Sequence, residues 1–353
     1  MRRKTRKVKI GKTYIGGDSP VLIQSMTNTK TSDFEATLAQ IKALQDSGCD
    51  IVRFSVASSA DIETIYKVKC ETDIPLVADI HFNYRLAIEA AEAGIDKIRI
   101  NPGNIGDEQR VAAVCKVCKA KNIPIRIGVN SGSLEKEVLA KYGAPTPEAL
   151  AESAFYNVLL LEKYDFNDIV ISVKSSDLSS MIYANRIISS KTDIPLHLGV
   201  TEAGTEEMGI IKSAVGIGSL LCDGIGETIR VSLTADVCKE VEAAKDLLSA
   251  CGLRKTINVI SCPTCGRTQV DLISLANRLN AEIKTKFPFP SRSLNVAVMG
   301  CAVNGPGEAR EADIGIAGGV GEFLLFKKGI SVGKVSQNDV IPILLDEIEK
   351  ILN

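Results

Sequence analysis

The chain has 353 residues, of which 45% are hydrophobic and 24% are charged, and its formal net charge is −1. This length and balance are typical of a globular protein of one or two domains with a sizeable core. The chain has no tryptophan and no apolar run of about 18 residues or more, which argues against an aromatic platform for nucleic acid and against a membrane span.

The chain opens with a strongly basic segment, MRRKTRK, at residues 1–7. No apolar stretch follows it, so we predict a solvated tail and not a secretory signal. From about residue 20 to 250, short β-rich runs alternate with amphipathic helical stretches such as 34–47 and 83–93. The predicted strands are 21–26, 51–56, 76–80, 97–101, 125–129, 168–173, 196–200 and 228–233.

The phrase TDIPL recurs at 72–76 and at 192–196, and each copy leads into a strand, as repeated βα units do. Eight such units in about 230 residues predict an α/β fold of the (β/α)8 TIM-barrel type. No Gly-x-Gly-x-x-Gly follows the first strand, which counts against an open dinucleotide-binding sheet.

After residue 253 the pattern changes. We predict strands at 258–261, 294–299, 313–317, 322–327 and 330–335, and helices at 271–286 and 340–352. The chain therefore divides into a TIM-barrel, substrate-binding domain at 1–253 and a small α+β domain at 254–353.

Functional residues of a TIM barrel lie at the carboxyl ends of its strands. The polar side chains expected at or near those ends are Gln24, Ser25, Arg53, Asp79, His81, Arg99, Asn101, Arg126, Asn130, Ser172, Lys174, His197, Thr201, Glu202, Glu227, Arg230 and Ser232. Five of them are cations within strands that are otherwise apolar, namely Arg53, Arg99, Arg126, Lys174 and Arg230.

A buried unpaired charge costs several kcal/mol. Five such charges would rival the whole stability of a domain, about 5–15 kcal/mol. Asp79 and Glu227 are too few to neutralise them. We therefore predict that the barrel mouth binds a multiply charged anion such as a diphosphate, to which arginine offers bidentate hydrogen bonds.

A purely structural role is the alternative at several of these positions. A single arginine of the set can instead tie a strand to the helical layer. Asn101 and Asn130 can bind substrate hydroxyls or merely shape turns. His81 and His197, the two histidines of the chain, can be site residues or structural ones.

Two glycine-containing loops of the second domain carry three cysteines and a glutamate: Cys262-Pro-Thr-Cys265-Gly-Arg267 and Met299-Gly-Cys301-Ala-Val-Asn-Gly-Pro-Gly-Glu308. Structural zinc takes four closed ligands, and no fourth cysteine or nearby histidine completes such a set. Three thiolates favour an iron–sulfur cluster, with zinc as the alternative. The glycines allow a tight backbone path that brings Glu308 to the same centre, as a ligand or as a plain surface residue.

The other seven cysteines fall in or beside helical patterns, and we predict small, mostly buried side chains: Cys49, Cys70, Cys115, Cys118, Cys222, Cys238 and Cys251. Cys115 and Cys118 form a CxxC, but it lies in a predicted helix at 108–121 without a second pair nearby, which disfavours metal binding. So many cysteines fit a reducing, cytoplasmic compartment better than a secreted disulfide framework.

The segments CPTCGR and MGCAVNGPGEA stand behind a barrel that bears VADIHF and KIRINPGN. With these motifs, and over nearly its whole length, the chain resembles the bacterial 4-hydroxy-3-methylbut-2-enyl diphosphate synthases, iron–sulfur enzymes of the methylerythritol phosphate route to isoprenoids. The resemblance implies reductive ring opening of 2-C-methyl-D-erythritol 2,4-cyclodiphosphate with loss of water. It also implies a [4Fe–4S] cluster held by Cys262, Cys265, Cys301 and Glu308.

The same resemblance implies that the strand-end residues bind the cyclic diphosphate, and we add Arg267 to that set. It makes Glu227 the candidate for proton handling, and Glu308 a catalytic residue that substrate oxygen displaces from iron. It implies the short, two-domain form of the family and a homodimer in which the cluster domain of one subunit caps the barrel of the other. No flavin or nicotinamide motif is visible, so a flavodoxin or ferredoxin is the expected electron donor.

Two rival functions remain at this point. The first is a zinc-stapled barrel enzyme that acts on a phosphorylated substrate without redox chemistry, such as an aldolase or a pterin-type transferase. The second is a non-enzymatic electron carrier, which would leave the cationic barrel mouth without a purpose.

Overall fold

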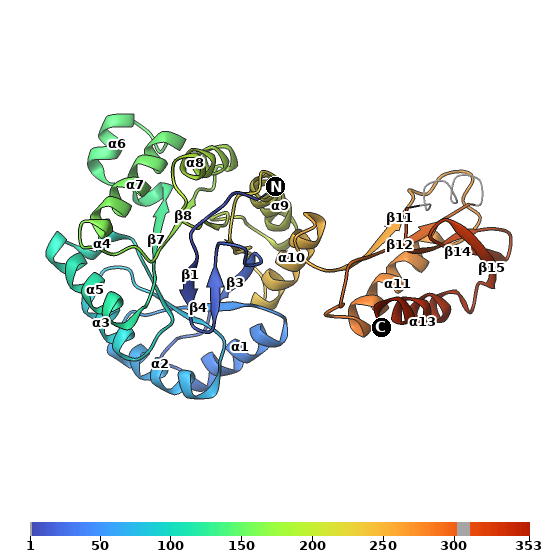
Figure 1. Ribbon diagram of the computed structural model, residues 1–353, viewed down its shortest axis with the longest axis horizontal. Helices are drawn as coiled ribbons and strands as arrows, with labels where there is room; N and C mark the ends of the chain where they lie inside the picture. The colour runs from blue at the N-terminus through green and yellow to red at the C-terminus, as the bar shows by residue number, and fades with distance from the viewer. Residues whose placement is uncertain (1, 302–310) are drawn as a thin grey trace. The chain divides into compact units, whose positions relative to one another are not determined.

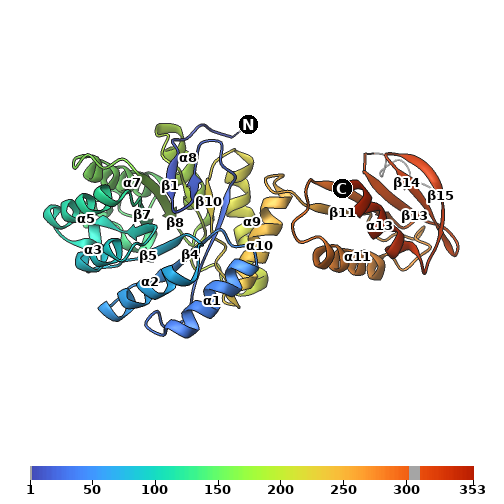
Figure 2. The ribbon, with the colours of Figure 1, turned by 60° about the horizontal axis from the view of Figure 1, so that its bottom comes forward.

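The structure is a computed structural model and describes residues 2–301 and 311–353. Two compact units make up the chain, Met1–Leu253 and Arg254–Asn353. In Figures 1 and 2 the first unit runs from blue to gold and the second from orange to red.

Eight short parallel strands form the centre of the first unit. They are β3 (Leu22–Met26), β4 (Ile51–Ser55), β5 (Leu76–Asp79), β6 (Lys97–Ile100), β7 (Ile125–Asn130), β8 (Ile169–Lys174), β9 (His197–Leu198) and β10 (Thr228–Ile229). Their order in the sheet is β8-β7-β6-β5-β4-β3-β10-β9. A parallel bridge between Ile171 and Leu196 joins the two edges, so the sheet closes into a barrel. The predicted TIM barrel is confirmed.

Helices cover the outside of this barrel (Figure 1). They are α1 (Phe34–Asp46), α2 (Ser59–Glu71), α3 (Tyr84–Glu92), α4 (Pro102–Ile105), α5 (Glu108–Lys121), the 3-10 turn η1 (Ser131–Ser133), α6 (Lys136–Tyr142), α7 (Pro147–Glu162), α8 (Leu178–Lys191), α9 (Glu206–Cys222) and α10 (Val237–Ala250). Local sequence sets where they begin: the Asp33 side chain accepts a hydrogen bond from the Ala36 amide at the start of α1. Their apolar faces pack against outward-facing strand residues such as Val52 and Phe54.

A short antiparallel hairpin closes the end of the barrel at which the strands begin. It consists of β1 (Val8–Ile10) and β2 (Thr13–Ile15). The buried cluster that it forms with the first inward residues of four barrel strands is Val8, Ile10, Ile15, Leu22, Ile51, Val77 and Val170. This apolar plug fills the lower end, so the carboxyl ends of the strands form the mouth.

The basic segment before the hairpin is anchored to the same lower end. Arg3 donates to the carbonyl oxygens of Thr192 at 2.8 Å and Ile194 at 2.5 Å. Arg6 Nη2 pairs with Asp193 Oδ1 at 2.6 Å. The prediction of a solvated tail is therefore wrong for these arginines, because carbonyls and a carboxylate at the strand entrances bind their guanidinium groups.

A five-stranded mixed sheet forms the second unit. Its strands, in hydrogen-bonded order, are β11 (Ile257–Ser261), β12 (Leu294–Met299), β13 (Ile314–Gly318), β14 (Glu322–Lys327) and β15 (Ile330–Ser336). The first three are parallel and the last two antiparallel to their neighbours. Helices α11 (Leu272–Lys286) and α13 (Val340–Leu352) share one buried core with the sheet, which confirms the predicted α+β class.

Within the part of the chain that the structure describes, no helix has the length and apolar character needed to cross a membrane. The ten cysteines lie in this part too, and none of them forms a disulfide.

Candidate functional site

Side chains alternate between the inside and the outside of the barrel. In β6, Ile98 and Ile100 belong to the core between strands and helices, so Lys97 and Arg99 point into the barrel. The strand register then sets Arg99 beside Asp79 on one side and beside Arg126 on the other. The sequence therefore brings charged groups of neighbouring strands together inside the mouth.

Asp79 binds two of the predicted arginines. Arg99 Nη1 lies 3.0 Å from Asp79 Oδ1, and Arg53 Nε lies 3.6 Å from Asp79 Oδ2. Burial alone would raise the pKa of this carboxyl, but Arg53, Arg99 and Arg126 outweigh that effect and lower it to about 2. Asp79 is thus a fixed anion that holds two guanidinium groups in place.

Arg230 has a different partner, Glu240 of α10. Arg230 Nη2 lies 3.2 Å from Glu240 Oε1, and the hydroxyl of Ser25 donates to Glu240 Oε2 at 2.9 Å. The sulfur of Met26 accepts from Arg53 Nη2 at 3.0 Å, and it also contacts Arg230. Glu240 is not among the residues predicted from the sequence, although it shares the buried face of α10 with apolar residues three and four positions away.

The mouth still holds more cations than carboxylates. Arg126 is buried, and its Nε and Nη1 have no hydrogen-bond partner among the described residues. Burial and the neighbouring arginines push the pKa of Lys174 well below its ordinary value. A guanidinium group keeps its proton in proteins, so the arginines of the mouth stay charged. The repulsion among these cations is therefore relieved when an anion binds between them.

Two glycines make room for these side chains. A Cβ at Gly128 of β7 would overlap the guanidinium of Arg99, and a Cβ at Gly199 would lie 2.5 Å from Lys174 Nζ. The sequence offered no signal for either, because the requirement comes from a neighbouring strand. The absence of a side chain at both positions leaves the space that Arg99 and Lys174 occupy.

Several predicted polar residues surround this cluster. Asn130 accepts from Arg99 Nη2 at 3.2 Å when its amide is oriented to satisfy both of its ends. Asn101 is buried and donates weakly to Ser133, and the hydroxyl of Ser172 donates to the Ile127 carbonyl at 3.1 Å. Of these three residues, Asn130 contacts a cation of the mouth, Arg99.

The two histidines lie at different depths. His81 follows β5 and is exposed, and its charge acts on Asp79, so it belongs to the mouth. His197 is fully buried, pairs in register with Thr228, and its Nδ1 lies 2.9 Å from the Thr228 hydroxyl. Thr228 is level with Leu22 of the plug, so His197 lies below the mouth and supports it from inside.

Three further residues follow the last two strands at the mouth end. Thr201 and Ser232 are half-buried, as expected for residues at a rim. Glu202 is exposed and has a positive φ of 53°, an unusual backbone conformation for this residue type. A carboxylate at the mouth held in such a conformation is a candidate acid, since strain of this kind concentrates at functional sites.

The position of Glu227 differs from the predicted one. It precedes β10, so it lies at the closed lower end and not at the mouth. Its Oε2 accepts from the Leu196 amide at 2.6 Å, and Arg2 and Arg3 pair with its two oxygens at 3.5 and 3.4 Å. Burial raises its pKa although both arginines oppose this. The catalytic assignment fails on position: the residue before a strand and the residue after it lie at opposite ends of a barrel.

Lys97 was absent from the predicted set. It is fully buried at the start of β6, level with Val77 of the plug, and its Nζ has no partner among the described residues. Burial, followed by Arg126 and Arg53, pushes its pKa well below the ordinary value. The lower half of the barrel interior therefore keeps a lysine that favours the neutral form.

The cysteine loops begin at one edge of the second unit's sheet. Parallel pairing matches Ser261 with Val298, so Cys262 and Gly300 follow neighbouring strand ends. The Gly300 amide donates to Cys262 Sγ at 3.3 Å. Backbone and side-chain hydrogen bonds from Arg267 lower the pKa of the Cys265 thiol. Amide donors and a lowered pKa favour thiolates, the form that binds metal.

Cys301 follows β12 directly after Gly300 and is buried. Within residues 2–301 and 311–353, no three cysteine, histidine or carboxylate side chains come close enough to hold a metal ion. Glu308 lies outside the described residues. The structure thus brings the two loops to one edge but does not assemble the whole predicted ligand set. Arg267 lies in the first loop and acts on the Cys265 thiol.

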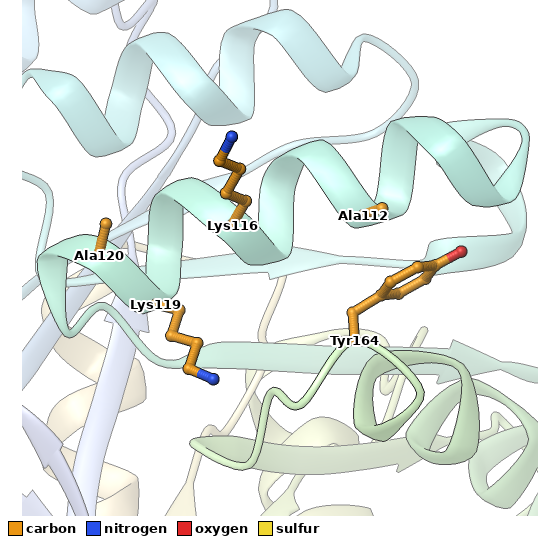
Figure 3. Close-up of a pocket in the computed structure, with 5 residues that line it drawn as sticks. All are labelled: Ala112, Lys116, Lys119, Ala120 and Tyr164. Carbon is orange, nitrogen blue, oxygen red and sulfur yellow. The ribbon is translucent and has the colours of Figure 1, made fainter.

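A depression on the helical layer stands apart from both regions. It is lined by Ala112, Lys116, Lys119, Ala120 and Tyr164 (Figure 3). These residues come from α5 and the turn after α7, and Lys119 already pairs with Asp165. The depression is a solvated face of the helical layer and not part of the mouth.

Comparisons with known proteins agree with this picture. Residues 5–245 match the family model described as GcpE TIM-barrel domain, and residues 258–350 match the GcpE protein C-terminal domain. A Clostridium perfringens protein named 4-hydroxy-3-methylbut-2-en-1-yl diphosphate synthase (flavodoxin) is 58% identical over 351 residues, which cover 99% of each chain. Proteins of the same name from Caldanaerobacter subterraneus and Fusobacterium nucleatum are 56% and 54% identical and match 100% of this chain and 98% of their own.

Solved dihydropteroate synthases resemble the chain more distantly. Those of Stenotrophomonas maltophilia and Yersinia pestis each give a TM-score of 0.51, at 14% and 12% identity, and cover 70% and 69% of this chain and 98% of their own. Likeness at this level of identity concerns the barrel fold alone.

Proposed function

Because the chain belongs to the GcpE family, we propose that it is the enzyme that converts 2-C-methyl-D-erythritol 2,4-cyclodiphosphate into 4-hydroxy-3-methylbut-2-enyl diphosphate. The reaction consumes two electrons and two protons, opens the ring by breaking one of its carbon–oxygen bonds, and removes a hydroxyl group as water. The observation that carries the proposal is the barrel mouth, where five basic side chains face two buried carboxylates, Asp79 and Glu240, and the exposed Glu202 among the described residues. A cyclic diphosphate supplies the missing negative charge.

The cations would bind the diphosphate oxygens. Arg126 and Lys174 are the strongest candidates, because buried Arg126 offers nitrogen atoms without a partner in the described residues and Lys174 is crowded by like charges. Arg53, Arg99 and Arg230 are already oriented by carboxylates and can offer their remaining N–H groups. Asp79 and Glu240 would thus position the guanidinium groups before substrate arrives.

The remaining polar residues would orient the carbon skeleton. We assign Asn101, Asn130, Ser172, Thr201, Ser232 and His81 to its hydroxyl groups and ring oxygens. Glu202 replaces Glu227 as the candidate acid, since it follows β9 at the mouth whereas Glu227 is held by Arg2 and Arg3 at the plugged end.

The second unit suits an iron–sulfur group. Amide donation to Cys262 and the lowered pKa of Cys265 are features of thiolate ligands, and Cys301 follows the neighbouring strand. Cys262, Cys265, Cys301 and Glu308 would hold a [4Fe–4S] cluster, which when bound supplies the two electrons one at a time. Arg267 would keep Cys265 in the thiolate form, a role that joins its predicted contact with substrate.

The source of the electrons and the assembly complete the proposal. The relatives described above carry flavodoxin in their names, so we propose flavodoxin as donor, with ferredoxin as the substitute. We further propose a homodimer, as the family resemblance implies. A reducing cytoplasm would preserve the ten cysteines, none of which is in a disulfide within the described residues.

An anaerobic assay tests the proposal directly. Protein purified without oxygen should convert the cyclic diphosphate to the linear product with an artificial one-electron reductant, and should contain about four iron and four acid-labile sulfide per chain. Stoichiometric zinc without sulfide would instead support the zinc-stapled enzyme. Colourless, iron-free protein that stays inactive after reconstitution would overturn the redox function.

A pair of variants separates the cluster from the other cysteines. Cys301→Ser should remove the brown chromophore and the turnover together. Cys70→Ser, at an exposed cysteine of α2, should leave both unchanged. Full activity in Cys301→Ser would remove this residue from the ligand set.

A further inference from the structure

Two cysteines of the helical layer lie at the ends of neighbouring helices, outside the cysteine loops of the second unit. Cys222 is the last residue of α9, and Cys251 is the residue that caps the end of α10. These helices are neighbours around the barrel, as Figures 1 and 2 both show. The two thiols are close enough that Cys222 contributes, after burial, to the raised pKa of Cys251. Cys222 is exposed and Cys251 is half-buried.

No other cysteine outside the cluster loops has this arrangement in the described part of the chain. Cys115 and Cys118 lie one turn apart on the same helix, and burial raises the pKa of each thiol to about 12. Cys49 is buried, with its pKa raised to about 12 for the same reason. Cys70 is exposed, but its Sγ contacts the Tyr66 carbonyl of its own helix and no second thiol.

We propose that Cys222 and Cys251 form a reversible disulfide, and that this pair is a redox modification site of the barrel. The proposal is independent of the reaction proposed above, because neither residue belongs to the mouth or to the cysteine loops. A disulfide needs two cysteines whose side chains already meet, and facing helix ends satisfy that requirement with little backbone movement.

The two thiols differ in a way that sets the order of events. Cys222 is open to solvent, so a low-molecular-weight disulfide such as glutathione disulfide can reach it. The Cys222 thiolate attacks one sulfur of that oxidant, forms a mixed disulfide and releases one glutathione thiol. The Cys251 thiolate then attacks Cys222 Sγ and expels the second glutathione. Two protein thiols are oxidised, one glutathione disulfide is reduced to two thiols, and the two protein protons pass to the leaving thiolates.

The closing step should be the slower one. Burial, and next the adjacent Cys222 thiol, raise the pKa of Cys251, so little of it is thiolate at neutral pH. Formation of the disulfide between Cys222 and Cys251 should therefore accelerate as pH rises toward the pKa of Cys251. The first step, in which Cys222 forms the mixed disulfide, does not depend on that pKa.

The bond would act where the chain leaves the barrel. Cys251 is followed by Gly252, whose φ is 68°, and the first unit ends at Leu253. Tying Cys251 to α9 would fix the last turn of α10, which directly precedes the second unit. Oxidation would then stiffen the exit of the chain without touching the mouth.

Peptide mapping tests the pair on full-length protein purified without oxygen. The protein is exposed to glutathione disulfide, remaining thiols are alkylated, and the peptides are analysed by mass spectrometry. We expect a peptide cross-linked between Cys222 and Cys251 that disappears on reduction. Cys70 serves as the internal control, because it should carry glutathione or the alkyl label but no cross-link.

Two variants complete the test. In Cys251→Ser, Cys222 should retain glutathione as a stable mixed disulfide, and in Cys222→Ser, Cys251 should be alkylated in full. The proposal is wrong if the wild type alkylates both residues completely while Cys70 is glutathionylated. It is equally wrong if Cys222 carries glutathione to the same extent in the wild type and in Cys251→Ser.

Discussion

The two ends of the barrel both bury arginines and carboxylates, but they balance them differently. At the lower end, Arg2 and Arg3 share Glu227. At the mouth, Arg53 and Arg99 share Asp79. The mouth adds Arg126 and Lys174, which the carboxylates there do not neutralise.

The difference shows what separates a structural charge from a functional one. At the lower end Arg2 and Arg3 are paired with Glu227 and with carbonyls such as that of Thr192, and burial favours the neutral form of Lys97, which has no partner among the described residues. At the mouth the excess of positive charge is a cost in the free protein, and an anion removes it. Arginines and carboxylates occur at both ends, so residue type alone does not distinguish them; the arginines of the mouth are more deeply buried and outnumber their carboxylate partners.

Removing Asp79, the carboxylate that two arginines of the mouth share, should strongly lower the stability of the protein. Asp79→Asn leaves Arg53 and Arg99 facing each other without their shared anion, and the loss of one partner of a buried pair costs about 3–5 kcal/mol of stability. Denaturant unfolding with and without inorganic pyrophosphate measures this. Pyrophosphate should restore part of the lost stability, because it supplies the negative charge that the neutral amide of the variant lacks.

The lower end offers the matched control for that experiment. Asp193 pairs with Arg6, but both side chains are partly exposed, so Asp193→Asn should cost less than about 1 kcal/mol. Pyrophosphate should have no effect on that variant beyond its effect on the wild type. Equal losses in the two variants would mean that the mouth holds no special excess of charge.

Arg126→Met should weaken anion binding without lowering the stability of the protein. The substitution keeps much of the volume of the side chain but removes a cation that is repelled by Arg53 and Arg99. We expect the affinity for pyrophosphate to fall by about 1.5–3 kcal/mol, as for the loss of a charged hydrogen bond, with unfolding stability unchanged or higher. Calorimetry and thermal unfolding measure the two quantities.

Arg3→Met is the control at the other end of the barrel. It removes an arginine that is matched by Glu227 and by the Ile194 carbonyl, so it should lower stability and leave pyrophosphate affinity unaltered. If Arg126→Met destabilises the free protein as much as Arg3→Met does, Arg126 is a structural residue.

Acid titration should show opposite signs at the two ends. The pKa of Asp79 falls from 3.8 to about 2 on folding, which stabilises the protein by about 2 kcal/mol above pH 4. That contribution is lost as pH falls from about 4 to 2. The pKa of Glu227 is raised by burial above 4.5, so its contribution is present at low pH and is lost as pH rises through the raised value.

Stability profiles of Asp79→Asn and Glu227→Gln against pH test these signs. The wild type minus Asp79→Asn difference should shrink as pH falls below 4, and the wild type minus Glu227→Gln difference should grow. Two differences that move in the same direction would contradict the assignment of one carboxyl to a cationic cluster and the other to a desolvated plug.

The sequence predicted the fold well because the fold depends on local patterns. The predicted helix at 340–352 and strand at 322–327 coincide with α13 and β14, whose apolar periodicity marks their buried faces. Two of the five cations in β-rich runs, Arg99 and Arg126, likewise point into the barrel beside one another. Such alternation and register follow from spacing that can be read along the chain.

The site was harder to predict because it depends on three-dimensional partners. Glu240 reaches Arg230 from a helix, and Gly128 makes room for Arg99 from the next strand, so neither carries a signal in its own segment. Lys97 and Arg99 lie two residues apart and face the same way, yet one supports the plug and the other the mouth. The error at Glu227 has a simpler origin, since the residue before the last strand was counted with the residues that follow strands.

Glu227→Gln tests whether this residue belongs to the lower end of the barrel or to the mouth. Glutamine keeps an acceptor for the Leu196 amide and is neutral, the form that burial favours at this position although Arg2 and Arg3 oppose it, so stability at neutral pH should change by less than about 1 kcal/mol. Turnover of the cyclic diphosphate should stay within about twofold, because the carboxylate lies at the plugged end. Glu202→Gln should instead combine normal unfolding with a loss of turnover of about 100-fold or more, as for a general acid. A Glu227→Gln enzyme that is fully stable but inactive would return this residue to the mouth and undo the distinction between the two ends.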